Sequence, residues 1–290
     1  MMEVSFSNKK DLTIKPSGRS TDFITPSFIF GCGFNCSYCY CKRNVTDVLK
    51  VYKNTEDILT EINSHAYFST VDKPNQTHEK YVTYDIGCNT DVALHAKHLE
   101  WEKIFQFFKE HPVAMGSFAT KYVNKKFLEF NPEGKIRIRF SLMPESLSEI
   151  LEPNTTSILE RIQAINLFIK AGYDVHINFS PVIVNETWLK DYAKLFDMIQ
   201  YYASRYGWNN EKVKAEVIFL THNAKKHEYN VEHSLPGEDL LWTPSIQEGK
   251  ISQYGGKNIR YKHDLKAGYI EEWLKLKEQK MSWLQIRYIF

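Results

Sequence analysis

Three cysteines with the spacing CxxxCxxC are the residues of this chain best suited to chemistry. Cys32, Cys36 and Cys39 lie on one short stretch just after the apolar, strand-like segment 26–30. Iron–sulfur clusters are held by cysteine thiolates, and a cubane cluster normally has four of them. Three thiolates leave one iron without a protein ligand, just as a catalytic zinc site keeps one position open. The spacing therefore predicts a 4Fe-4S cluster with one iron available to a substrate or cofactor.

Two simpler interpretations of the same cysteines remain open at this point. Cys36 and Cys39 form a CxxC pair, which is typical of half of a structural zinc site. The other half of such a site is not evident, because the chain has no second CxxC pair and the nearest downstream histidine is His65. A thioredoxin-like redox pair would use the same CxxC but would leave Cys32 without a role.

The elements that must position these cysteines follow an alternation of strands and helices. Six segments have the composition of strands: 23–30, 81–86, 113–120, 135–142, 173–179 and 213–220. Helical periodicity separates them at 54–66, 101–108, 125–130, 156–171 and 186–202. This order predicts βαβ units and a parallel sheet. Because six units are too few for a closed eight-stranded barrel, we expect an α/β fold with a partial (βα)6 barrel.

Chemistry in such folds gathers at the carboxyl ends of the strands. That rule selects the loops that begin at Gly31, Gly87, Thr120, Ser141 and Pro181. Around this barrel, assigned to residues 25–222, we expect an N-terminal lead-in at 1–24 and an irregular C-terminal cap at 223–290 that packs on the barrel. The cap includes an amphipathic helix at 270–279.

The composition is that of an ordinary globular protein. Hydrophobic residues make up 43% of the 290 residues, which is enough for a sizeable core. The formal net charge is only +2, so nucleic-acid binding would depend on a local basic surface. Four of the five cysteines fall within residues 32–41, which argues against a disulfide framework and for a reducing compartment. With no signal peptide and no apolar run of about eighteen residues, we expect a soluble, cytoplasmic protein without membrane contact.

The cysteine spacing resembles the cluster loop of the radical S-adenosylmethionine (SAM) enzymes. A narrower resemblance, to the spore photoproduct lyase family, rests on segments that follow one another in that family's order: 36–40 (CSYCY), 87–92 (GCNTDV), 119–122 (ATKY), 139–141 (RFS), 151–156 (LEPNTT), 160–162 (ERI), 170–173 (KAGY) and 180–182 (SPV). The first resemblance implies that the open iron binds SAM and that an electron from the cluster cleaves it to a 5′-deoxyadenosyl radical. The second implies a radical SAM barrel that reverts a thymine dimer in spore DNA.

Cofactor-binding roles follow from the resemblance residue by residue. The three cysteines of segment 32–39 would hold the 4Fe-4S cluster, and Thr90, Lys121 and Ser141 match positions that line the SAM pocket. Met143 departs from the family's pattern, because an asparagine is usual two residues beyond the serine of Arg-Phe-Ser. Gln253 departs as well, since it replaces an arginine that would lie near a DNA phosphate.

Catalytic roles are implied for three further residues. Cys88 matches the cysteine that donates a hydrogen atom to the product thymine radical. Tyr38 and Tyr40 match tyrosines that relay the hydrogen back toward SAM. S–H and phenolic O–H bonds are the weakest X–H bonds on side chains, which suits these roles. The simpler alternatives are an inert buried thiol for Cys88 and exclusion of water from the cluster for the two tyrosines.

The resemblance as a whole predicts a lyase that cleaves the methylene bridge of 5-thyminyl-5,6-dihydrothymine in DNA. One alternative is a radical SAM enzyme that acts on another modified base or nucleotide. Another is a non-catalytic iron–sulfur or zinc protein that binds nucleic acid, which would neither bind SAM nor depend on Cys88. For the lyase we expect an electron donor such as a flavodoxin or ferredoxin, and a monomer.

Overall fold

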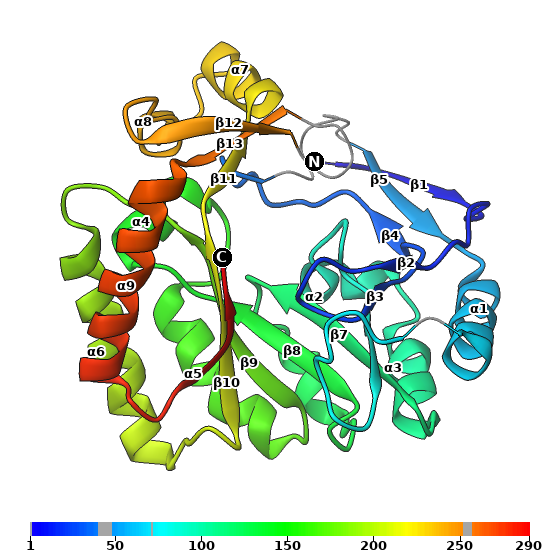
Figure 1. Ribbon diagram of the computed structural model, residues 1–290. Helices are drawn as coiled ribbons and strands as arrows, with labels where there is room; N and C mark the ends of the chain where they lie inside the picture. Colours follow the sequence, from blue (N-terminus) through cyan, green and yellow to red (C-terminus); the bar gives the residue numbers. More distant parts are fainter. Residues whose placement is uncertain (1, 40–47, 71, 252–256) are drawn as a thin grey trace. The chain divides into compact units, whose positions relative to one another are not determined.

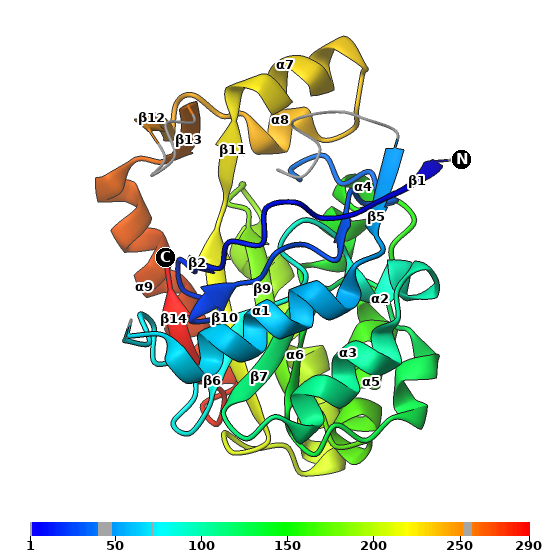
Figure 2. The same cartoon turned by 90° about the vertical axis from the view of Figure 1, so that its right-hand side faces the viewer.

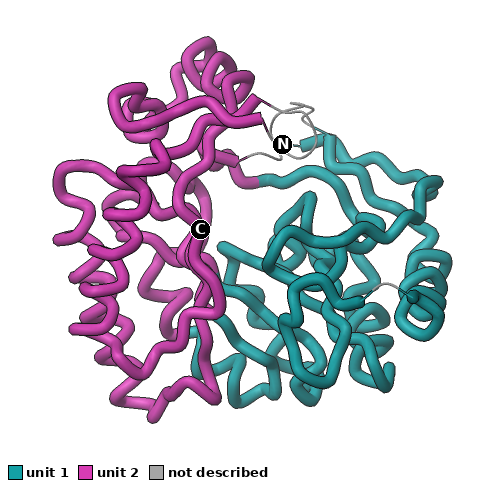
Figure 3. Tube along the Cα trace, viewed as in Figure 1, with its two compact units in different colours: residues 1–33, 46–140, 164–176 teal, residues 34–45, 141–163, 177–290 magenta. Residues whose placement is uncertain are grey.

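The computed structural model describes residues 2–39, 48–70, 72–251 and 257–290. Its internal contacts divide the chain into two compact units (Figure 3). Unit 1 comprises Met1–Gly33, Thr46–Phe140 and Ala164–His176, and unit 2 comprises Phe34–Val45, Ser141–Gln163 and Ile177–Phe290. These limits differ from the domain boundaries that we expect after residues 24 and 222. The division into lead-in, barrel and cap stays a prediction.

Unit 1 contains the N-terminal strands and the first helices (Figure 1). Their bounds are β1 Glu3–Ser7, β2 Lys15–Pro16, β3 Phe23–Ile24, β4 Ile29–Phe30, β5 Val48–Tyr52, α1 Thr55–Phe68, β6 Val82–Asp85, α2 Val92–His95, the 3-10 helix η2 Ala96–His98, α3 Trp101–Glu110, β7 Ala114–Thr120, the 3-10 helix η3 Lys125–Glu129 and β8 Ile136–Ser141. The last residue of β8 belongs to unit 2.

A parallel sheet forms the centre of unit 1. β3 pairs with β6, β6 with β7 and β7 with β8, all in parallel, while β2 adds an antiparallel edge. α3 buries Ile104, Phe105 and Phe108 and contacts both β7 and α1 (Figure 2). These apolar residues recur at helical spacing, so one stripe of the helix can cover the sheet. Apart from the strand expected at 23–30, the helix and strand predictions for this part are confirmed within a few residues, with a 3-10 helix at the segment expected at 125–130.

The expected first strand at 23–30 is instead two short strands in different sheets. β3 continues the parallel sheet as far as Thr25, whose N–H donates to the carbonyl of Asp85 (3.1 Å). Pro26 follows and has no N–H to donate, so the ladder ends there. β4 then pairs antiparallel with β5, and β5 pairs parallel with β1. The segment before the cysteines is therefore an edge strand of a small sheet.

Unit 2 contains the C-terminal elements, with β9 and α5 shared between the units. Their bounds are α4 Glu145–Leu151, α5 Ile158–Lys170, β9 Asp174–Val182, α6 Trp188–Tyr206, β10 Val213–Phe219, β11 Thr221–Asn223, α7 Ala224–Glu232, α8 Glu238–Leu241, β12 Gln247–Ile251, β13 Lys257–Tyr261, α9 His263–Lys280 and β14 Gln285–Ile289. Trp273 of α9 is fully buried against Tyr192 and Phe196 of α6 and Phe179 of β9. This aromatic cluster holds α9 onto α6.

The segment expected to be an irregular cap is largely regular. β11, β13 and β12 form an antiparallel sheet, and α9 is longer than the helix expected at 270–279. β14 pairs in parallel with β10, so the chain end adds a strand to the large sheet. Among the described residues, the strands of this sheet follow one another in the order β14-β10-β9-β8-β7-β6-β3-β2. No helix in the described part of the chain is long and apolar enough to cross a membrane.

Candidate active site

The CxxC pair lies on a tight turn in unit 2. The N–H of Cys39 donates to the carbonyl of Cys36 (3.1 Å), and the N–H of Ser37 donates to the carbonyl of Leu151 (3.0 Å). Cys36 is buried, Cys39 is partly exposed, and neither is in a disulfide. The turn therefore presents two thiols, three residues apart, from a backbone that is anchored to the end of α4.

A second anchor of this turn comes from α7 and α8. The Asn230 side chain donates to the carbonyl of Ser37 (2.8 Å), and the Ser37 hydroxyl donates to the carbonyl of Pro236 (2.9 Å). Asn230 also donates to Glu238. His222 and His227 lie 3.0 and 2.6 Å from the same carboxylate. Because these residues are about two hundred positions from the cysteines, the sequence analysis missed them.

The Glu238 carboxylate has a pKa set by two opposing effects. Burial would raise the pKa, but hydrogen bonds from His222, Asn230 and His227 outweigh it and lower the pKa below its usual value. Glu238 is therefore ionised at neutral pH and accepts hydrogen bonds on both oxygens. The charge keeps the Asn230 amide oriented toward the turn.

The remaining cysteine of the motif, Cys32, lies in unit 1 and is buried. The N–H of Gly31 donates to the carbonyl of Asn89 (3.1 Å), and the N–H of Gly33 donates to Nε2 of His95 (2.9 Å). Gly31 has a φ of +106°, and a Cβ there would meet the carbonyl oxygen of Val48 at 3.1 Å. Glycine is thus required beside Cys32, because an L side chain would be strained.

Cys88 lies on a turn at the carboxyl end of β6 in unit 1 and is partly exposed. Oδ1 of Asp85 accepts the N–H of Gly87 (2.8 Å), while Oδ2 of the same carboxylate pairs with Nη2 of Arg139 (2.8 Å). The N–H of Thr90 closes the turn on the carbonyl of Gly87 (3.3 Å). Arg139 therefore helps to fix the backbone next to Cys88 through Asp85. Sequence analysis singled out Arg139 only as part of a motif.

Asp91 joins two of the positions assigned to the SAM pocket. Its carboxylate accepts the N–H of Lys121 (2.8 Å) and the hydroxyl of Thr120 (2.8 Å), and it caps α2 through the N–H of Leu94 (3.0 Å). Burial raises the pKa of Asp91 despite these hydrogen bonds. The neighbouring Thr90 hydroxyl is buried and has no hydrogen-bond partner among the described residues. The ends of β6 and β7 thus hold Thr90 and Lys121 on adjoining loops.

Tyr38, within the CxxC turn, belongs to a buried network in unit 2. Its hydroxyl donates to Glu152, and the Glu152 carboxylate pairs with Nη1 of Arg161 (2.8 Å). Nη1 of Arg161 also donates to the carbonyl of Ser141 (2.9 Å). Burial, followed by the nearby Glu152 charge, raises the pKa of Tyr38 well above its usual value. The phenol is therefore neutral and keeps its hydrogen.

Ser141 itself is the last residue of β8 and is buried. Its hydroxyl lies 3.5 Å from Nδ2 of Asn178 on β9, and the N–H of Leu142 donates to the backbone carbonyl of Asn178 (3.0 Å). The network therefore connects Tyr38, at the cysteine turn, with Ser141, at the end of a strand.

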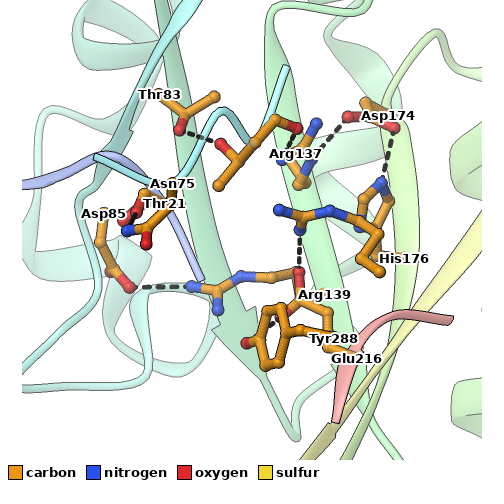
Figure 4. Close-up of polar contacts among 12 residues, drawn as sticks. Thr21, Asn75, Thr83, Asp85, Arg137, Arg139, Asp174, His176, Glu216 and Tyr288 are labelled. Carbon is orange, nitrogen blue, oxygen red and sulfur yellow. Dashed lines mark hydrogen bonds and ion pairs between the residues drawn. The ribbon is translucent and has the colours of Figure 1, made fainter. Parts of the chain in front are cut away.

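Further buried charges lie on the strands of unit 1 (Figure 4). Arg137 of β8 pairs with Asp174 of β9 (2.6 Å), and the same carboxylate lies 3.3 Å from Nε2 of His176. Burial alone would raise the pKa of Asp174, but His176 and Arg137 together lower it. In unit 2, Glu216 binds Arg287 and the hydroxyl of Tyr288. Period-two alternation places Arg137 and Arg139 on one face of β8, and Asp174 and His176 on one face of β9.

The donor set fits the cluster that the sequence predicts. The cysteine motif supplies three thiols, of which two share one turn, and none of the three is in a disulfide. Among the described residues no group of His, Cys, Asp or Glu could hold a single metal ion, but each thiolate of a cubane binds a different iron. The Thr90 hydroxyl, which is buried and has no partner within the part of the chain that the structure describes, suits a polar cofactor such as SAM. Tyr40, which is predicted to be catalytic, lies outside the described residues. So does Cys41, the fourth cysteine of segment 32–41, to which no role is assigned.

Solved structures similar to this chain include spore photoproduct lyase complexed with dinucleoside spore photoproduct, with a TM-score of 0.86 and 20% identity. A double variant of spore photoproduct lyase with bound AdoMet and dinucleoside spore photoproduct also has a TM-score of 0.86, with 19% identity. Both alignments cover 99% of this chain and 82% of the other. The expected α/β fold, a partial (βα)6 radical SAM barrel, is confirmed.

Curated relatives are spore photoproduct lyases as well. The protein of Bacillus subtilis (strain 168) is 24% identical over 196 residues, which is 66% of this chain and 54% of the relative. The chain thus spans about half the length of that relative. The protein of Geobacillus sp. (strain Y412MC61) is 24% identical over 278 residues, 92% of this chain and 76% of the relative. The family model described as spore photoproduct lyase matches residues 4–289, so the chain belongs to the spore photoproduct lyase family.

Proposed function

We propose that this protein is a radical SAM lyase that cleaves the methylene bridge of 5-thyminyl-5,6-dihydrothymine in DNA. The observation that carries the proposal is the placement of Cys88. This residue is partly exposed on a turn at the carboxyl end of a parallel strand, where ligands bind in folds of this kind. The family match over residues 4–289 supports the choice of reaction.

Cofactor binding is assigned to six residues. Cys32, Cys36 and Cys39 would hold the 4Fe-4S cluster, while the Thr90 hydroxyl, Lys121 and Ser141 would bind SAM. The chemistry that the two groups would supply when bound is a 5′-deoxyadenosyl radical, able to remove a hydrogen atom from C6 of the dihydrothymine half of the lesion. Solved relatives that contain AdoMet and dinucleoside spore photoproduct support this pair of ligands.

Cys88 acts after the methylene bridge has broken. Its S–H bond breaks homolytically, the hydrogen atom passes to the thymine radical, and the unpaired electron stays on sulfur. Tyr38, with Tyr40, would then pass a hydrogen atom from 5′-deoxyadenosine to this sulfur, which restores the thiol and returns the radical to the cofactor. The raised pKa of Tyr38 supports this role, since a tyrosinate would have no hydrogen atom to give. The lesion must leave the base stack to reach the thiol, at a cost of about a few kcal/mol.

The test is an anaerobic incubation of the reconstituted, dithionite-reduced protein with SAM and the lesion dinucleotide. Mass spectrometry follows the thymine products and 5′-deoxyadenosine. We expect repair by the wild type and altered products with Cys88→Ala. Cys88→Ser is the matched control, because it keeps the polarity and nearly the volume but has a much stronger X–H bond; it should behave as Cys88→Ala does.

Each outcome separates one part of the proposal. Formation of 5′-deoxyadenosine without repair would refute the substrate and favour another modified base or nucleotide. Absence of SAM cleavage would refute the enzyme and favour a non-catalytic iron–sulfur protein. We further propose that a flavodoxin or ferredoxin donates the electron and that the protein acts as a monomer. Reduction assays with either donor, and size-exclusion chromatography with light scattering, test these two points.

A further inference from the structure

Asn178, in the middle of β9, has a carboxamide that is only partly satisfied. The residue is 5% exposed. Nδ2 lies 3.5 Å from the Ser141 hydroxyl, whereas Oδ1 is buried and has no hydrogen-bond partner among the described residues. An unpaired buried acceptor destabilises a folded protein, and most buried polar atoms are paired. A strand interior would be better served by valine or isoleucine, so the asparagine needs another explanation.

The position of Asn178 indicates what that explanation is. Its backbone carbonyl accepts the N–H of Leu142, which puts it beside the end of β8, next to Ser141. Ligands of parallel α/β sheets bind at the carboxyl ends of the strands. Met143, two residues beyond Ser141, is buried and has no hydrogen-bonding group of use there. Asn178 is thus the residue beside Ser141 that can offer a bound molecule an unused polar atom.

We propose that Asn178 is a SAM-binding residue whose unpaired carboxamide end hydrogen-bonds an uncharged polar group of the nucleoside part of SAM. The inference rests on the proposed function. The carboxamide is neutral, which suits ribose hydroxyls or the adenine amino group better than the charged ends of the methionyl part. Exchange of Oδ1 and Nδ2 leaves the inference intact, because one end faces Ser141 in either case and the other end is available.

A buried water is the alternative partner for Oδ1. The two cases differ in what a substitution does. If water satisfies the amide, Asn178→Leu leaves the affinity for SAM unchanged. If SAM is the partner of the amide, the same substitution removes an unpaired buried acceptor from the free protein and a hydrogen bond to SAM from the complex. The variant is then at least as stable as the wild type without SAM, and yet it binds SAM more weakly.

The experiment measures SAM affinity by anaerobic equilibrium dialysis on reconstituted, unreduced protein, so that no cleavage occurs. Asn178→Leu should weaken SAM binding about fivefold to tenfold, the effect of one buried hydrogen bond. Iron content and the thermal midpoint without SAM should not fall. Ser117→Ala is the matched control, because the Ser117 hydroxyl is also buried and unpaired among the described residues. It should leave SAM affinity unchanged. If Asn178→Leu does not fold, Asn178→Ala decides by the same measurement.

A second ligand tests which part of SAM is bound. 5′-Methylthioadenosine carries the nucleoside without the amino acid, so Asn178→Leu should weaken its binding by a similar factor. Loss of SAM affinity without loss of methylthioadenosine affinity would overturn the nucleoside assignment. Unchanged SAM affinity in the variant would overturn the inference while leaving the proposed function intact. Failure of the wild type to bind SAM would overturn both.

Discussion

The buried ion pair between Glu152 and Arg161 offers the sharpest test of the network that links the cysteine turn to Ser141. Their side chains are 1% and 0% exposed, and the two atoms that pair lie 2.8 Å apart. Glu152→Gln removes the negative charge and leaves the guanidinium buried. Breaking a buried pair in this way costs about 3–5 kcal/mol of unfolding free energy. Arg161 keeps neutral acceptors on Ser141, Thr155 and Thr156, so we expect the lower limit, about 3 kcal/mol.

Urea unfolding of the cluster-free protein, monitored by circular dichroism, measures this change. The double variant Glu152→Met/Arg161→Met removes both charges and fills similar volume. Replacing both members of a buried pair is often close to neutral, so the double variant should be more stable than Glu152→Gln alone. If Glu152→Gln costs less than about 1 kcal/mol, or if the double variant is the less stable of the two, the pair is not the buried, charge-balanced unit described above.

The same substitution has a consequence for Tyr38. The Tyr38 hydroxyl donates to Glu152, and Arg161 ties the same carboxylate to the backbone of Ser141. In the Glu152→Gln variant the new amide must present its oxygen to Arg161 and its NH2 group to the phenol, which turns Tyr38 from donor to acceptor. We therefore expect Glu152→Gln to change the return of the radical to the cofactor, seen as more SAM consumed per repaired lesion. An unchanged ratio would refute a role for this hydrogen bond.

Three further predictions follow from other contacts. Arg139→Met breaks its pair with Asp85 and should alter the repair products while 5′-deoxyadenosine still forms; normal products by mass spectrometry would contradict the positioning of the Cys88 turn. Asn230→Leu removes the hydrogen bond to the carbonyl of Ser37, which is worth about 1 kcal/mol, so a chelator should bleach the cluster severalfold faster in the variant. An unchanged bleaching rate would contradict the role of Asn230 in anchoring the cysteine turn. The pKa of Asp174 is lowered in the folded protein, so its ion pair contributes fully to stability above the usual pKa of 3.8, and this contribution is lost as the pH falls below that value. In urea unfolding at a series of acidic pH values, Asp174→Asn should therefore lose less stability on acidification than the wild type does. An equal loss in both proteins would be inconsistent with the ion pair.

Local pattern was enough to predict most of the barrel. β8 alternates buried apolar residues such as Ile138 with polar ones such as Arg139, and α3 carries its apolar residues at helical spacing. Strand prediction likewise selected the loops that begin at Gly87, Thr120 and Ser141, because strand ends follow from it, whereas the roles of Cys88 and Thr90 came from the family resemblance. These features depend on residues close together in the chain.

Contacts between distant segments could not be predicted in the same way. Asn230 and Ser37 are separated by 193 positions, and nothing in the polar segment 224–241 indicates that it holds the cysteine turn. Glu152 and Arg161 belong to segments that resemble the family, but the sequence does not show that Glu152 contacts Tyr38. That contact depends on the packing of the cysteine turn against the end of α4. The split of the first expected strand was visible in principle, since Pro26 cannot donate to a ladder.

Two of the three predicted cluster cysteines are more buried than Cys88. Cys32 and Cys36 are 8% and 4% exposed, whereas Cys39, like Cys88, is partly exposed. A cluster ligand benefits from burial, because solvent exposure changes the reduction potential of an iron–sulfur cluster. A hydrogen donor needs the opposite, since its sulfur must reach a substrate that enters from outside. The Asp85 carboxylate accepts the backbone N–H of Gly87, and the next residue, Cys88, is partly exposed. The turn is therefore held in place without full burial of Cys88.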